Sequence, residues 1–306
     1  MTGPSTPWGC GSSASRMRLA VGVRSLLVAC AVCAAGLAAA ATPAVAAIGP
    51  RYLTVMTLNI KHAKLSPTGL AGVAAVIRSA HPDVVGLQEV DRSWSRSGNV
   101  DQAAELAQAL GMKSFFQPNL NCVSADLSGD GFCQYGNAIL SRYPFVGGSF
   151  RLYSLPTVPR AEPRGLARVA INVGGRIVDL FNAHLTYINA LRPRQVEFIR
   201  NLVRRDRRPF VVTGDFNARP FFPEMVRLRQ VVRDAPSAAG RPSLRTFAVG
   251  TPVPFDYVFL PRPPVNGPPQ RLAALSARVI YLPQVSDHRP LIARIRIPPT
   301  GGRTAR

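Results

Sequence analysis

Apolar and β-branched residues recur along the chain in short runs that end in Gly, Pro or a small polar residue. Runs of this length and composition predict β-strands that are buried on at least one face. The predicted strands cover residues 51–60, 83–88, 136–141, 166–173, 176–185, 209–212, 255–260, 274–282 and 291–297. Gly174-Gly175, a turn dipeptide, separates two of these runs, so we expect the two to pair as an antiparallel hairpin.

Apolar residues at helical spacing occupy several of the intervals between these strands. They predict helices over residues 66–80, 99–110 and 191–205, with a short helical stretch near Glu224. Ser66-Pro67 is expected to cap and open the first helix, and Asn99 is expected to cap the second. The alternation of strands and helices predicts a layered α/β protein, and the sequence contains no repeat of fixed period.

The beginning of the chain is typical of an export signal. Arg16 and Arg18 precede an apolar, alanine-rich segment over 19–41, and Ala44-Val45-Ala46 supplies the small-x-small pattern that signal peptidase cleaves. We therefore expect residues 1–47 to be removed and the protein to be secreted.

Two alternatives would leave the protein anchored to a membrane. The apolar segment is long enough to span a bilayer if it is not cleaved, and Leu27-Val28-Ala29-Cys30 is similar to a bacterial lipidation signal. Under the cleavage hypothesis, residues 48–297 form one large domain and residues 298–306 form a disordered tail.

The charge of the chain indicates anionic partners. It carries 37 Lys and Arg against 16 Asp and Glu, a formal net charge of +21. Such an excess favours nucleic acid, phospholipid headgroups or another anionic surface. An Arg-rich genomic composition is the alternative source of this charge, so the charge supports an anionic substrate without identifying it.

Only two of the five cysteines lie beyond the predicted signal, Cys122 and Cys133. An even number of cysteines in an exported chain predicts a disulfide, and the polar, Gly-rich loop between these two would gain stability from one. A catalytic thiol would need a neighbouring base, and none is apparent.

Polar side chains that could take part in catalysis or metal binding lie at the ends of the predicted strands. Asp215 and Asn217 follow the 209–212 strand two residues apart, so their side chains are expected to point the same way. An Asx turn explains the same two residues without a site. Similar strand-end positions hold Asn59, Glu89, His184, Asp287 and His288, each of which has a structural explanation when taken alone.

Taken together and in order, these motifs resemble the endonuclease/exonuclease/phosphatase superfamily, which includes DNase I-like nucleases. The matching segments are Thr57-Leu-Asn-Ile60, Gln88-Glu-Val90, Gly136-Asn-Ala-Ile-Leu-Ser-Arg142, Asn182-Ala-His-Leu185, Thr213-Gly-Asp-Phe-Asn217, Phe255-Asp-Tyr257 and Ser286-Asp-His288. The resemblance implies a DNase I-like fold of the α/β (α+β) class: a four-layered α-β-β-α sandwich with two mixed, mainly antiparallel sheets.

The resemblance also implies a role for each of these residues. Hard oxygen donors that suit Mg²⁺, with Mn²⁺ or Ca²⁺ as alternatives, are expected at Asn59, Glu89 and Asp287. His288 is the expected general base, oriented by Asp256. Contacts to the water and to the substrate phosphate are expected from Asp215, Asn217, His184, Arg164 and Asn137. Asp287 and His288 are adjacent, so one of them must leave regular strand geometry to reach the same site.

The function expected from the resemblance is Mg²⁺-dependent phosphodiester hydrolysis by a secreted, monomeric nuclease with no stable protein partner. A phospholipid or sphingolipid phosphodiesterase, a phosphoinositide phosphatase and a non-catalytic basic binding protein are the alternatives. Secreted sphingomyelinases of this type usually carry an exposed aromatic hairpin. Trp94 and Phe221-Phe222 offer no clear equivalent of that hairpin.

Overall fold

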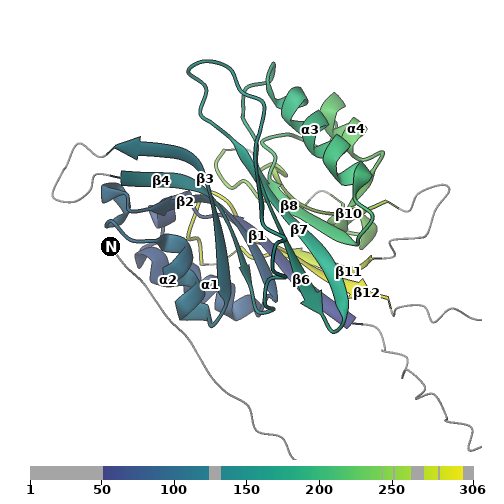
Figure 1. Ribbon diagram of the computed structural model, residues 1–306, viewed down its shortest axis with the longest axis horizontal. Helices are drawn as coiled ribbons and strands as arrows, with labels where there is room; N and C mark the ends of the chain where they lie inside the picture. The colour runs from purple at the N-terminus through teal and green to yellow at the C-terminus, as the bar shows by residue number, and fades with distance from the viewer. Residues whose placement is uncertain are drawn as a thin grey trace, which may run out of the picture. The chain divides into compact units, whose positions relative to one another are not determined.

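The computed structural model describes residues 51–123, 132–242, 244–250, 252–262, 272–281 and 283–298 (Figure 1). The predicted signal over 1–47 and all but the first residue of the predicted tail over 298–306 lie outside the described residues. Within the described ranges, no helix has the length and apolar character needed to cross a bilayer.

Two six-stranded sheets form the centre of the fold. In spatial order, the first sheet contains β11 (Ala273–Val279), β12 (Leu291–Ile297), β1 (Arg51–Asn59), β2 (Val84–Arg92), β4 (Phe132–Ser141) and β3 (Lys113–Val123). The second contains β5 (Arg151–Ser154), β6 (Gly165–Val173), β7 (Arg176–His184), β8 (Phe210–Asp215), β10 (Asp256–Pro261) and β9 (Val232–Asp234). The predicted sandwich is therefore confirmed.

Each sheet has one parallel pair among antiparallel neighbours, β1–β2 in the first and β7–β8 in the second. A helix connects the two strands of each pair, because parallel strands need a crossover. These helices are α1 (Gly69–Ala80) and α3 (Arg192–Arg205). Parallel pairing brings the carboxyl ends of both strands to the same edge of the sheet, which places Asn59 near β2 and His184 beside Asp215.

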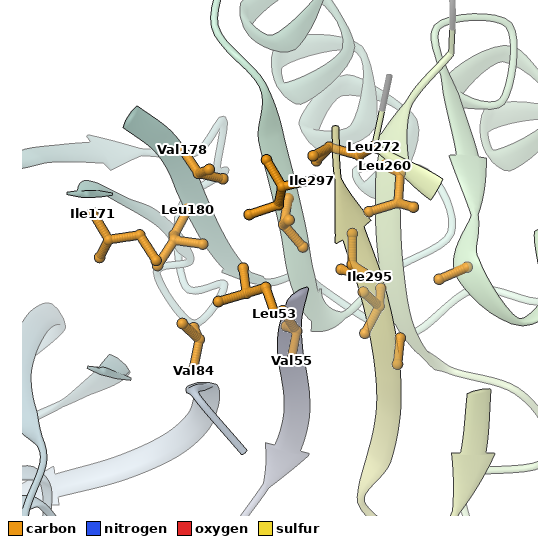
Figure 2. Close-up of a cluster of buried hydrophobic side chains, with 14 of the residues drawn as sticks. Leu53, Val55, Val84, Ile171, Val178, Leu180, Leu260, Leu272, Ile295 and Ile297 are labelled. Atoms are coloured by element: carbon orange, nitrogen blue, oxygen red, sulfur yellow. The ribbon is translucent and has the colours of Figure 1, made fainter. Parts of the chain in front are cut away.

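Three apolar clusters hold the layers together. One lies between the sheets and includes Leu53, Val55, Leu180 and Ile295, whose side chains converge in Figure 2. The second lies between the first sheet and the helices α1 and α2 (Gln102–Leu110), and the third between the second sheet and the helices α3 and α4 (Pro223–Leu228). Strand residues alternate between these clusters, as the period of two predicts.

Several element boundaries differ from the sequence prediction. Helix α1 begins at Gly69, after Thr68, so the predicted cap at Ser66 is wrong. Asp101 caps α2 by accepting a hydrogen bond from the Ala104 amide, so the predicted cap at Asn99 is also wrong. The short elements η1 (Lys61–Ala63), η2 (Ser95–Ser97) and α5 (Ala235–Ala238) were not predicted, nor were β3, β5 and β9.

The predicted disulfide is confirmed. Cys122 on β3 and Cys133 on β4 are bonded and lie directly opposite each other in the antiparallel register, with their Cα atoms 5.0 Å apart. The bond closes a short loop at the end of the two strands. Closing such a loop restricts the unfolded chain more than the folded one.

Removing this disulfide should lower the free energy of unfolding by about 3 kcal/mol, the value expected for a loop of this length. Denaturant unfolding of the Cys122→Ser/Cys133→Ser double variant measures the change, with the oxidised parent protein as reference. An unfolding midpoint equal to that of the parent would show that the bond does not contribute to stability.

Candidate functional site

The layer between the two sheets changes from apolar to polar towards the carboxyl ends of the central strands. On β1 the inward face continues from Leu53 and Val55 to Thr57 and Asn59, and each of these residues is fully buried. On β8 the same alternation leads from Val211 through Thr213 to Asp215. Because alternation fixes the face, Asn59 and Asp215 point into the same interlayer space.

A buried hydrogen-bond network supports this polar end. Gln88 Nε2 donates to Asn182 Oδ1 at 2.6 Å and to Thr57 Oγ1 at 3.1 Å, and Thr213 Oγ1 donates to Asn182 Oδ1 at 3.1 Å. The sheets approach closely here, and a Cβ atom added to Gly86 would lie 2.1 Å from Thr213 Oγ1. The network therefore fixes the spacing of the two sheets directly below the candidate site.

Glu89 reaches the site through a break in its strand. Regular alternation after Val85 and Leu87 would point Glu89 towards the helices. Instead, the β2–β4 register shifts between Leu87 and Val90, and Glu89 has a φ of 56°. A non-glycine residue in this conformation is strained, which is typical of functional positions. The bulge places the Glu89 carboxylate 2.9 Å from Asn59 Nδ2, which also donates to Asp215 Oδ2 at 3.2 Å.

His288 and Asp256 form a buried pair next to Asp215. His288 Nδ1 lies 2.8 Å from Asp256 Oδ2, and His288 Nε2 lies 3.5 Å from Asp215 Oδ2. Asp287 and His288 both reach the cavity because residues 286–289 form an irregular loop, held by the His288 amide donating to Ser286 Oγ. The geometric difficulty expected for adjacent residues on a strand therefore does not arise.

The charges of this pair depend on each other. Burial alone would lower the pKa of His288, but the Asp256 and Asp215 carboxylates outweigh this effect and raise the pKa to about 10. Burial raises the pKa of Asp215 to about 7, while the nearby imidazolium opposes that rise. A cation bound beside these carboxylates would offset their field and so lower the pKa of His288.

A second group of donors borders the same space. Arg164 is 5% exposed, and its Nη1 lies 2.8 Å from His184 Nδ1. Burial and the Arg164 charge lower the pKa of His184, so this imidazole is neutral near pH 7. Asn217 Nδ2 lies 3.3 Å from His184 Nε2, and the Asn217 amide donates to Asp215 Oδ1 at 2.9 Å. Asp215 and Asn217 therefore form the Asx turn that was considered as an alternative explanation, and they also border the candidate site.

These residues line a cavity of about 460 Å³. Of the residues predicted for the site, Glu89, Arg164, His184, Asp215, Asn217, Asp287 and His288 line it directly. Asn59 and Asp256 lie behind them, each in contact with Asp215 or His288. Asn137 does not line the cavity. It is fully buried and donates from Nδ2 to the Gly165 carbonyl, linking the two sheets, so its position does not support the predicted phosphate contact.

Two groups of residues have the chemistry to hold a divalent cation. The predicted group supplies carboxylate oxygens from Glu89 and Asp287, and Lys61 Nζ compensates this acidity at 2.8 Å from Asp287 Oδ2. Asn59 turns its Nδ2 towards Glu89, and its Oδ1 accepts from the Lys61 amide at 3.1 Å, so its amide would have to rotate to offer oxygen to a cation. In the other group, ligand atoms of Asp215, Asp256 and His288 lie within 4.8 Å of one another. A cation bound to His288 Nδ1 would have to replace its 2.8 Å hydrogen bond to Asp256, and one bound to Nε2 would occupy the nitrogen that faces Asp215 and is needed to accept a proton. The carboxylates of Glu89 and Asp287 therefore fit a cation better.

Several residues that line the cavity were missed by the sequence analysis. Lys61 and His62 follow Ile60 directly, and their positive φ angles of 50° and 53° turn them back over the cavity. His62 Nε2 lies 3.7 Å from Glu89 Oε2. Their position next to the Thr57-Leu-Asn-Ile60 motif was an available signal. Tyr135, Tyr187 and Phe247 had no comparable signal in the sequence.

Comparison with known proteins supports the family and the fold expected from the sequence. The model of the Endonuclease/Exonuclease/phosphatase family matches residues 56–288, and no curated protein matches the chain. Among solved structures, a Beutenbergia cavernae endonuclease/exonuclease/phosphatase is 25% identical, with a TM-score of 0.64 over 81% of this chain and 72% of that chain.

Two further structures share the fold at lower identity. Danio rerio TDP2 complexed with single-strand DNA product is 18% identical, with a TM-score of 0.61 over 80% of this chain and 98% of that chain. A Bacteroides thetaiotaomicron mannosyl-6-phosphatase is 17% identical, with a TM-score of 0.59 over 79% of this chain and 99% of that chain. The family match covers most of the chain, so the chain belongs to the endonuclease/exonuclease/phosphatase family and is a phosphoester hydrolase of this divalent-metal-dependent group.

Proposed function

We propose that this protein is an exported, Mg²⁺-dependent phosphodiesterase that cleaves nucleic acid. One observation supports this most strongly: the buried His288–Asp256 pair, the Glu89–Asn59 group and the Arg164–His184 pair all border one cavity. The arrangement provides a base, hard oxygen ligands and phosphate-binding donors, which together meet the needs of phosphodiester hydrolysis.

The residues divide the chemistry among them. Asp256 accepts a hydrogen bond from His288 Nδ1, and in the neutral form of the imidazole Nε2 is then free to take a proton from a water molecule next to Asp215. Arg164 supplies a permanent positive charge, and neutral His184 supplies a hydrogen bond to the phosphoryl oxygens. Glu89, Asn59 and Asp287 would hold the cation. When bound, it would withdraw charge from the phosphate and so make attack easier.

Two observations favour nucleic acid as the substrate. The net charge of +21 suits a polyanion, and one structural neighbour is described with a single-strand DNA product. The mannosyl-6-phosphatase neighbour makes a phosphomonoester the second candidate. The aromatic side chains of Tyr187 and Phe221 are 70% and 67% exposed, but the two residues belong to separate segments. They therefore give little support to a membrane-binding hairpin.

Chelation should abolish hydrolysis by the purified protein, and Mg²⁺ should restore it. The carboxylates around Glu89 are expected to act only by holding a cation, and it is the cation that would withdraw charge from the phosphate. Plasmid DNA, RNA, sphingomyelin vesicles, a phosphoinositide and a sugar phosphate are assayed in parallel, and Mn²⁺ and Ca²⁺ are compared with Mg²⁺. Hydrolysis that is indifferent to EDTA would contradict the metal requirement. Cleavage of sphingomyelin or a phosphomonoester alone would contradict the proposed substrate.

A further inference from the structure

We propose that Trp94, Arg96 and Tyr135 form a subsite that binds a nucleobase next to the scissile phosphate. This inference rests on the proposed function and specifies the part of the substrate that the cavity recognises. All three residues line the cavity that contains Glu89 and His288. None of them belongs to the metal-binding or acid–base groups described above.

A buried carboxylate holds the subsite in one geometry. Arg96 Nη2 and Nε donate to the two oxygens of Asp91 at 2.7 and 2.8 Å, and Asp91 is fully buried. The Arg96 guanidinium lies 3.7 Å from the centre of the Trp94 ring. Backbone amides of Ser97, Gly98 and Asn99 bond within this turn and fix its path. A stacked pair fixed in this way is preorganised to receive a ligand.

Tyr135 connects this stack to the phosphate-binding side of the cavity. Its ring centre lies 5.5 Å from the Arg96 guanidinium and 6.4 Å from the Trp94 ring, which meets it edge-on. The charge of Arg164 acts on the Tyr135 hydroxyl, which burial keeps neutral by raising its pKa. A ligand held by Arg164 through its phosphate therefore has the Tyr135–Arg96–Trp94 surface beside it.

The chemistry of the surface favours a planar aromatic ligand. Arg96 is bonded to both oxygens of the fully buried Asp91, whereas Arg164 pairs through one nitrogen with Glu162, whose side chain is 41% exposed. The Arg96 guanidinium is therefore less suited to a second phosphate than Arg164 is. Its planar face can still stack, because 40% of the Arg96 side chain remains exposed. Flat guanidinium and aromatic groups bind bases of any sequence by stacking, whereas an alkyl chain gains nothing specific from them.

Tryptophan fluorescence offers a test that does not depend on turnover. The sequence contains only two tryptophans, so a full-length Trp8→Phe variant reports on Trp94 alone. A His288→Ala substitution in the same chain prevents hydrolysis during titration. Adenosine 5′-monophosphate is compared with ribose 5-phosphate, which carries the same phosphate but no base.

We expect the nucleotide to quench Trp94 and to bind about tenfold more tightly than ribose 5-phosphate, the order expected for one stacked base. Arg96→Ala should remove most of this preference. Arg96→Lys keeps a positive charge for Asp91 but has no planar face, so it should also lose the preference for the nucleotide. This variant keeps the test valid if Arg96→Ala folds poorly. Arg294→Ala is the matched control, since Arg294 lies over Tyr52 away from the cavity.

Equal affinity for the two ligands, without a change in Trp94 fluorescence, would overturn the subsite. Quenching by sphingomyelin vesicles but not by the nucleotide would overturn it in favour of a lipid surface. These outcomes are separate from failure of the proposed function. Wild-type protein that cleaves DNA, combined with equal affinity of the Trp94 reporter variant for adenosine 5′-monophosphate and ribose 5-phosphate, refutes the subsite alone. Tighter binding of the nucleotide without phosphodiester hydrolysis refutes the function alone.

Discussion

Replacement of His288 by alanine should reduce kcat for phosphodiester hydrolysis by about a hundredfold to ten-thousandfold, the usual contribution of a general base. The imidazole is 6% exposed and bonded to Asp256, so its removal deletes the group placed to accept the proton from water. Steady-state kinetics on a DNA substrate give kcat and KM separately. We expect KM to change little, because Arg164 and His184 remain to bind the phosphate.

Two further variants separate chemistry from folding. Asp256→Asn keeps the shape of the orienting residue but removes its charge, so it should lower kcat by about a hundredfold and lower the pKa of His288. His81→Asn changes an exposed histidine that ends α1 in a left-handed conformation, which asparagine tolerates, so it should leave kcat unchanged. A wild-type kcat for the His288→Ala variant would show that His288 is not the general base.

Glu89→Gln should weaken binding of Mn²⁺ or Mg²⁺ by about a hundredfold, an effect of the size seen when one negative ligand is lost near a divalent ion. Glutamine keeps the size of the side chain and its hydrogen bond with Asn59, so the loss reports the charge of Glu89. Calorimetric titration with Mn²⁺ measures the affinity directly, and the Mg²⁺ dependence of hydrolysis should shift by the same factor.

Glu105→Gln is the matched control, because Glu105 is an exposed acid in the first turn of α2, outside the cavity. Asp215→Asn tests the alternative cation site, which is formed by Asp215, Asp256 and His288. If Glu89→Gln binds Mn²⁺ normally while Asp215→Asn does not, the cation is held by Asp215, Asp256 and His288 instead.

Some of the site could be predicted because it follows the regular geometry of strands. Asn59 and Asp215 continue the inward alternation of β1 and β8, so the same pattern that identifies the core also identifies their direction. His184 follows the same alternation from Val178 and Leu180 on β7. Parallel pairing then brings His184 and Asp215 to adjacent register positions.

Other parts depend on contacts that no local pattern encodes. Alternation alone would point Glu89 at the helices, and only the bulge opposite β4 turns it into the cavity. Lys61 and His62 reach the site through a left-handed turn that sequence propensity does not favour. The pairing of Lys61 with Asp287 joins residues 226 positions apart.

The missed strands have a related explanation. β3 contains Pro118, which sequence rules treat as a strand breaker, yet β3 lies at the edge of the first sheet where a missing amide is tolerated. β5 is four residues long, mostly exposed, and also an edge strand. Both owe their conformation to the neighbouring strand, so their own sequences carry only a weak signal.

Crystals of the protein soaked in Mn²⁺ and measured at the manganese absorption edge locate the cation directly. We predict an anomalous peak at direct coordination distance from the Glu89 carboxylate, with His288 Nδ1 still bonded to Asp256. A peak bound to His288 and Asp256, with none beside Glu89, would contradict the division of these residues into a metal-binding group and an acid–base pair.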